Sequence, residues 1–145
     1  MPEEDVLQRA REDAWEGKSP STQAGEFVRE EIEHVREGKH GARNTKQAIA
    51  IGLSKARRAG IHLPPPGRSA SPSVRRKAAQ DTRKGRHPRK PSKRRSRAIS
   101  GALRRESKRS ASRQALSRQA RTAARRRGAP ARRRSARRAA RTRHR

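Results

Sequence analysis

Large apolar side chains are concentrated in the first 63 residues, where they recur at the spacing of amphipathic helices. A first helix is predicted over residues 2–16 and ends before Gly17. Its first turn is acidic, which the helix dipole favours. Its apolar positions share one face, from which Trp15 is absent; they are Val6, Leu7, Ala10 and Ala14. This face is narrow, so the helix is not expected to be stable alone.

A second helix is predicted from about Pro20 or Ala24 to Glu37, with Gly38 after it. Glu31 projects into the middle of its apolar arc. The carboxylate is either a boundary group that reaches water or the partner of a base from the next segment. The rest of the arc is apolar and consists of Ala24, Phe27, Val28, Ile32 and Val35.

A third helix is predicted over about residues 45–59, between the N-cap Asn44 and Gly60. Gln47 completes a capping box with Asn44. Gly52 lies on a face of small residues that would let another helix approach closely. Ile51 lies among polar residues instead, so it contacts the N-terminal helix or marks a surface for a partner. The apolar stripe consists of Ile49, Leu53 and Ala56.

The second and third helices are expected to form an antiparallel hairpin, because the loop between them has about six residues. The segment from Ala24 to Leu63 is close to the lower size limit for independent folding. Marginal stability, or a homodimer through the Ile51 side of the head, is therefore expected.

The chain after Leu63 has little apolar material. Pro64, Pro65 and Pro66 favour an extended spacer, and the further prolines of residues 68–97 are expected to break any helix there. Residues 98–127 have a composition that favours helix but no stripe that faces a core. They are expected to become helical only when their charge is neutralised. The large apolar residues that remain are Val74, Ile99, Leu103 and Leu116.

The predicted fold is therefore all-α, a small helical head with a long, largely disordered basic tail. The head comprises an N-terminal acidic helix (residues 1–17) and a helical hairpin domain (residues 20–63). Residues 64–97 are a Pro/Ser/Arg-rich linker. Residues 98–145 are an Arg/Ala-rich basic tail, disordered or conditionally helical, because low hydrophobicity and high net charge do not offset the entropy of ordering.

Charge is sorted along the chain. Residues 1–37 hold eleven of the thirteen acidic side chains and carry −6, whereas residues 38–145 carry +35, for a total of +29. Such a charge opposes compaction and indicates a polyanionic partner. The chain has no Cys, no apolar run long enough to span a membrane, and an acidic start unlike a secretory signal. A cytoplasmic protein located at the nucleoid is expected.

Arg and Lys bind phosphate and release the counterions condensed on duplex DNA, largely without reading sequence. The tail has no aromatic residue to stack on unpaired bases, which argues against a reader of single strands. The five His residues lack Cys partners and regular metal spacing, so surface histidines are expected and no metal or cofactor is predicted. No catalytic arrangement is visible, so neither an enzyme nor a small-molecule substrate is predicted.

The predicted nucleic-acid contacts are Lys and Arg side chains of the loop and third helix, followed by the clustered Lys and Arg side chains of the tail. In the head they are Lys39, Arg43, Lys46, Lys55, Arg57 and Arg58. In the tail they are Arg75, Arg76, Lys77, Lys93, Arg94, Arg95, Arg104, Arg105, Arg125, Arg126, Arg127, Arg132, Arg133, Arg134, Arg137 and Arg138. The acidic helix is expected to cover the tail when DNA is absent.

The stretch from Lys39 to Arg57 reads Lys-His-Gly, then Gln-Ala-Ile-Ala-Ile-Gly-Leu-Ser-Lys-Ala-Arg. It resembles an uncharacterised small domain family of bacteria and phages, over residues 27–60 in all. That resemblance implies a domain rather than an activity. The tail resembles bacterial histone-H1-like and protamine-like basic proteins in composition.

These observations favour a non-enzymatic, histone-like protein that binds or compacts DNA with little sequence preference. Two alternatives stay open. One is a basic protein associated with RNA or the ribosome. The other is an adaptor whose head binds a protein while the tail only localises it to nucleic acid.

Overall fold

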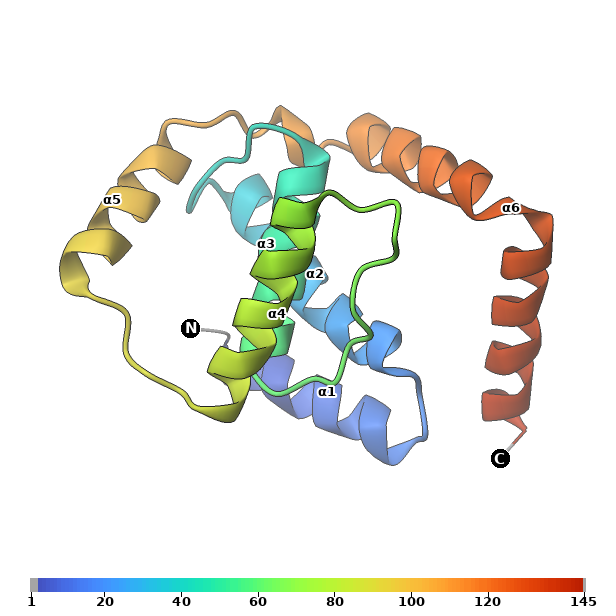
Figure 1. Ribbon diagram of the computed structural model, residues 1–145. Coiled ribbons are helices and arrows are strands. Elements are labelled where there is room, and N and C mark those ends of the chain that lie inside the picture. The colour runs from blue at the N-terminus through green and yellow to red at the C-terminus, as the bar shows by residue number, and fades with distance from the viewer. Residues whose placement is uncertain (1–2, 145) are drawn as a thin grey trace.

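The computed structural model describes residues 3–144. All regular elements in that range are helices joined by loops, and none is a strand (Figure 1). The all-α prediction is confirmed. The elements are six α-helices and one short 3-10 helix, η1. Their bounds are Glu4–Trp15 (α1), Pro20–Glu37 (α2), Thr45–Arg58 (α3), Pro72–Arg86 (α4), Lys93–Arg104 (α5), Arg109–Ala111 (η1) and Arg113–Arg143 (α6).

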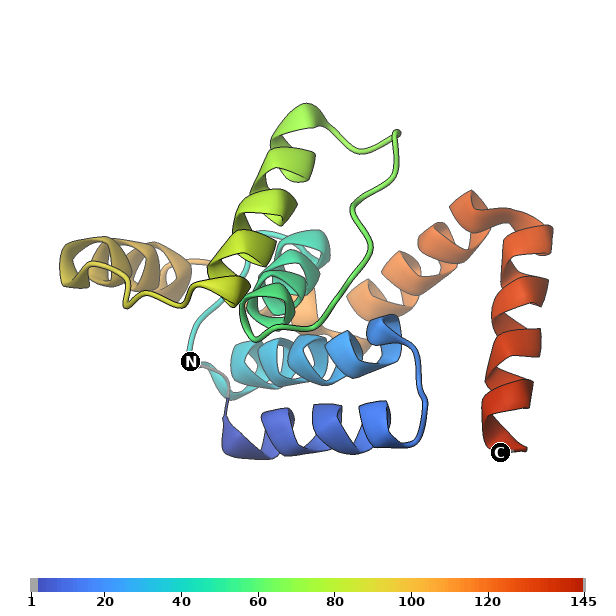
Figure 2. The same cartoon turned by 60° about the horizontal axis from the view of Figure 1, so that its bottom comes forward.

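Helices α1 and α2 lie side by side and antiparallel, as Figure 2 shows. Gly17 follows α1 at φ 73°, a left-handed conformation that glycine adopts without a Cβ clash. Val6 and Ala10 of α1 are buried with Phe27 of α2 in one core cluster. The two predicted helices are therefore confirmed, with Val6 and Ala10 buried as expected, but Ala14, which is expected on the same apolar face of α1, is exposed.

The hairpin of α2 and α3 forms the centre of the head. Helix α2 ends at Gly38, which has φ 81°, and the Asn44 side chain caps α3 by accepting a hydrogen bond of 2.9 Å from the Gln47 amide. A Cβ on Gly52 would lie 2.6 Å from the Val28 Cα, so the two helices approach too closely for any other residue there. The predicted hairpin, its cap and the small-residue face are confirmed.

Helix α4 corrects the expectation that prolines break helix over residues 68–97. Pro72 occupies the first turn, where its missing N–H interrupts no helical hydrogen bond, and the Ser71 side chain caps the helix. Helix α4 packs on α3 through Asp81, which is 1% exposed and accepts a hydrogen bond of 2.7 Å from Ser54. This part of the predicted linker therefore covers the head.

The docking of α4 also accounts for Ile51. This residue is half-buried and shares a face of α3 with Ser54 and Arg58, both of which contact Asp81 of α4. The sequence predicts that Ile51 meets the N-terminal helix or a partner. In the structure α4 lies over this face instead.

Residues 103–116 form a second attachment of the tail, against the loop between α2 and α3. The Gly41 amide donates a hydrogen bond of 2.8 Å to the Leu103 carbonyl. Leu116 of α6 packs against a second core cluster, although the sequence shows no core-facing stripe over residues 98–127. Ala111 of η1 is 1% exposed in that cluster, and its other buried members are Ile32, Val35, Ala42 and Ala48.

The long disordered tail expected from composition is not supported, because α5 and α6 are helical. Neither helix has a buried residue, but Ser92 and Ser112 cap them, and Ala, Arg and Lys are strong helix formers. Gly128, at φ 74° and ψ 165°, and Pro130 divide α6 into two arms that meet at a bend (Figure 1). No helix within residues 3–144 is long and apolar enough to cross a membrane.

Candidate functional site: the Glu31 cluster and the basic surface

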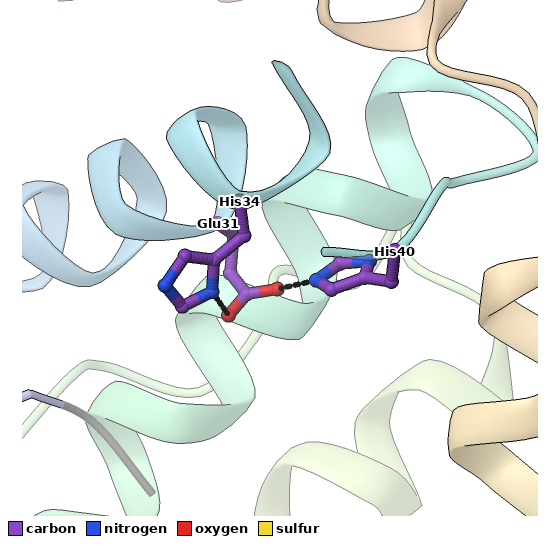
Figure 3. Close-up of side chains that lie close together, drawn as sticks. All are labelled: Glu31, His34 and His40. Atoms are coloured by element: carbon purple, nitrogen blue, oxygen red, sulfur yellow. Dashed lines mark hydrogen bonds and ion pairs between the residues drawn. The ribbon is translucent and has the colours of Figure 1, made fainter. Parts of the chain in front are cut away.

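Glu31 lies in the middle of α2 and is 0% exposed. Lys55 of α3 donates a short hydrogen bond to its Oε1 atom, and His40 of the loop has Nε2 3.0 Å from its Oε2 atom. His34, nearly one turn further along α2, has Nδ1 3.6 Å from Oε1. Figure 3 shows the carboxylate between the two imidazole rings. The predicted ion pair with a base from the next segment is therefore confirmed, and the boundary interpretation is wrong.

Glu30, the preceding residue, is 3% exposed and shares Lys55 with Glu31. Its Oε1 atom accepts a hydrogen bond of 2.7 Å from the Glu3 amide. Its Oε2 atom is buried without a hydrogen-bond partner among the described residues and lies 3.6 Å from the Lys55 ammonium. One ammonium group therefore faces two buried carboxylates. Lys55, with a side chain only 18% exposed, neutralises the interior and is not one of the surface bases.

His34 and His40 are half-buried, not the surface histidines that the sequence predicts. The His40 Nδ1 atom lies 2.9 Å from the Gly41 carbonyl oxygen, and because a carbonyl only accepts, this nitrogen carries a proton. The His34 Nε2 atom lies 3.4 Å from a carboxylate oxygen of Glu3. Sequence reasoning missed this cluster because it sought regular metal spacing. The signal that could have found it is Glu31 in an apolar arc, three residues before His34 on the same helix.

Among the head bases, Arg43 and Lys46 are exposed beside the N-terminus of α3. Lys39 is exposed too, but its ammonium lies 3.3 Å from Glu3 and 3.4 Å from Glu37. Its hydrogen bond to Glu3 raises the pKa of Lys39 above its ordinary value, and the same contact lowers the pKa of Glu3. Arg43 and Lys46 are therefore the head bases best placed to contact phosphate.

Three further predicted contacts, Arg57, Arg58 and Lys77, make polar contacts within the fold. The Arg57 guanidinium donates a hydrogen bond of 3.0 Å to the Pro64 carbonyl. Arg58 and Lys77 both face Asp81, at 3.9 Å and 2.6 Å, while about half of each side chain stays exposed. Asp81 is thus neutralised within the fold and shields little of the tail's outward charge.

The other predicted tail bases are all exposed, and none is in an ion pair with a carboxylate among residues 3–144. They are Arg75, Arg76, Lys93, Arg94, Arg95, Arg104, Arg105, Arg125, Arg126, Arg127, Arg132, Arg133, Arg134, Arg137 and Arg138. The structure does not bring them to one site, because α5 and the second arm of α6 lie on opposite sides of the molecule in both views (Figures 1 and 2).

The acidic residues of α1 and α2 do not cover this tail. Within the described residues, their ion pairs are with Lys and Arg of the head or with His34 and His40. The expected competition between the acidic helix and DNA for the tail therefore has no contact to support it.

Comparison with known proteins gives a family match over the part of the chain that contains the hairpin. No curated protein and no solved structure matches the chain. Residues 18–66 match the model of a family described as a family of unknown function, DUF6496. The match is wider than the predicted residues 27–60 and contains α2, α3 and the Glu31 cluster. The hairpin of this chain is therefore similar to a domain family of unknown function.

Proposed function

We propose that this chain is a non-enzymatic, histone-like nucleic-acid-binding protein that holds duplex DNA by its phosphates with little sequence preference. The observation that supports this proposal is that Lys and Arg side chains far outnumber acidic side chains in the tail. Residues 64–145 hold 31 Lys and Arg against two acids, and one of these acids, Asp81, is buried between bases. Phosphate is the partner that relieves this repulsion.

Helix α6 has the dimensions and charge for such contacts. Its 31 residues contain thirteen Arg and no acid, over about 45 Å of helix in total at 1.5 Å per residue, divided between two arms at Gly128. These bases lie on every side of the helix, so no single face is reserved for a protein core. Arg suits the task because its planar guanidinium donates two parallel hydrogen bonds to one phosphate.

The head provides fixed attachment points for the helices that carry these basic side chains. Helix α4 is attached through Asp81, and residues 103–116 are attached through Ala111 and the loop after α2. Arg43 and Lys46 lie at the start of α3, where the helix dipole also favours an anion. We infer that the head orients the basic helices, that DNA compaction follows when they bridge separate duplexes, and that the protein resides at the nucleoid.

The test is a salt titration of the full chain with two short DNA duplexes of unrelated sequence, followed by fluorescence anisotropy. Both duplexes should bind with similar affinity, and log K should fall linearly with log salt by about 0.9 per phosphate contact. Neutralising five bases of the second arm, by changing Arg132, Arg133, Arg134, Arg137 and Arg138 to Gln, should reduce that slope by up to roughly 4 to 5.

The matched control changes the same five residues to Lys, which keeps the charge and should keep most of the slope. Binding that is independent of salt, or unaffected by the Gln variant, would contradict the proposal. Clear preference for a duplex RNA competitor over duplex DNA would favour the RNA alternative instead.

A further inference from the structure

The Glu31 cluster has the donor set of a metal centre. One carboxylate oxygen of Glu31 and one ring nitrogen each of His34 and His40 all lie within 4.8 Å of one another. We propose that these three side chains bind one divalent transition-metal ion, with Zn²⁺ as the ion that this donor set fits. The resulting site would lie inside the hairpin, separate from the proposed phosphate-binding surface.

The hydrogen bonds of His40 indicate which of its two ring nitrogens is free to bind a metal ion. Its Nδ1–H donates to the Gly41 carbonyl, so a neutral ring has only a lone pair on Nε2. That lone pair points at a Glu31 oxygen only 3.0 Å away. Two acceptors at this distance require a cation between them, which is either a proton on Nε2 or a metal ion.

His34 repeats the pattern. Its Nε2 atom faces the exposed carboxylate of Glu3 at 3.4 Å, and its Nδ1 atom faces the other oxygen of Glu31 at 3.6 Å. Histidines that bind metals commonly donate their outer N–H to a carboxylate or a backbone carbonyl, which fixes the ring and leaves the inner nitrogen to the metal. Both rings of the cluster have such an outer acceptor.

The charges allow a metal ion to enter. Lys55 lies on Glu31, and its ammonium would oppose a cation there. The Oε2 atom of Glu30 is buried, has no hydrogen-bond partner among residues 3–144, and lies 3.6 Å from the same ammonium. A small movement of Lys55 onto Glu30 would release Glu31 for the metal and satisfy the unpartnered oxygen.

The distances suit Zn²⁺. Bonds of roughly 2.0–2.1 Å in a tetrahedron place ligand atoms about 3.3 Å apart. The His40 Nε2 atom lies 3.0 Å from Oε2 of Glu31, and the His34 Nδ1 atom lies 3.6 Å from Oε1, so each nitrogen is near that separation from a different oxygen of the same carboxylate. Two imidazoles and one carboxylate are a known Zn²⁺ donor set, in which water takes the fourth position. Binding would join α2 to the loop before α3 and stabilise a hairpin of marginal size.

The test is calorimetric titration of the full chain with Zn²⁺ after treatment with a chelator. We expect one ion per chain and a rise in melting temperature on binding. His34→Gln and His40→Gln should each weaken binding by at least tenfold. The control is the double variant His62→Gln with His87→Gln, which removes two exposed histidines outside the cluster and should bind as the parent chain does.

A second measurement does not depend on the folding of a variant. Nitrogen NMR of the imidazoles in the parent chain should show His40 protonated on Nδ1, with the Nε2 signal shifted when Zn²⁺ is added. Failure to bind one ion, loss of binding in the control double variant, or unchanged Nε2 signals would overturn the proposal. The cluster would then be an ion pair closed by a proton on His40.

Discussion

The close crossing of α2 and α3 makes Gly52→Ala a sharp test of the fold. A Cβ at this position would lie 2.6 Å from the Val28 Cα and 2.9 Å from the Val28 N, which is 0.8 Å and 0.5 Å short of the 3.4 Å at which ordinary van der Waals contact begins. Both neighbours are backbone atoms, so the helices have to separate. Overpacking costs typically about 1–3 kcal/mol, and alanine regains roughly 1 kcal/mol of helix propensity. We expect a net loss of up to about 2 kcal/mol.

The chain supplies a matched control in Gly25→Ala. Gly25 is also inside a helix, α2, but its added Cβ would meet nothing within 4 Å. This variant should gain roughly 1 kcal/mol, so the two alanine substitutions have opposite signs. Urea unfolding followed by far-UV circular dichroism measures both. A Gly52→Ala protein as stable as Gly25→Ala would refute the close approach of the two helices.

Four further outcomes follow from single contacts. Asn44→Ala, which removes the α3 cap, should cost about 1 kcal/mol in urea unfolding. Asp81→Ala should release α4 and raise its amide hydrogen exchange, while exchange in α1 stays unchanged. The double variant Gly128→Ala with Pro130→Ala should straighten α6. The distance between the two ends of α6 should then increase in a fluorescence energy-transfer measurement. Glu3 should titrate below its ordinary pKa by NMR and return towards it in Lys39→Ala. The contact of Glu3 with Lys39 contributes stability above the ordinary carboxyl pKa, and this contribution is lost as pH falls through the lowered value.

The helices of the head could be predicted because their signals are local. Gly38 ends α2 and Asn44 begins α3 with the conformation or hydrogen bond that each residue type favours. The small-residue face at Gly52 indicated a close helix partner before the partner was known. Such signals need only a few neighbouring residues, so a single sequence carries them.

The attachments of the tail could not be predicted in the same way. Asp81 lies in a segment where the prolines are expected to break any helix, and only the fold shows that it is buried against Ser54. Ala111 is one alanine among many, and its burial depends on the loop after α2. Composition gives only the average content of apolar side chains in a segment. It therefore does not reveal a segment that one or two buried side chains attach to the head.

The Glu31 cluster lies between these cases. The position of Glu31 in the apolar arc is visible in sequence, and so is the choice between water and a base. The fold was needed to bring Lys55 from α3 and His40 from the loop to the same carboxylate. A buried ion pair contributes little net stability compared with an apolar replacement, because desolvation offsets its attraction. The proposed binding of a metal ion would give this buried ion pair a role beyond stability.

The distribution of charge connects the head to the proposed function. Residues 1–63 hold eleven acids and eleven Lys and Arg, so the head is neutral, and the whole excess of +29 lies beyond it. The acidic side chains of the head pair within the head, and within the described residues none of them reaches a tail base. The head therefore neither repels the basic helices nor competes with phosphate for them. What it supplies is attachment at Asp81 and Ala111, from which bases without acidic partners extend in different directions. Because such an arrangement leaves the repulsion among tail bases uncompensated, binding of the proposed duplex DNA across α5 and α6 would lower the free energy of this fold.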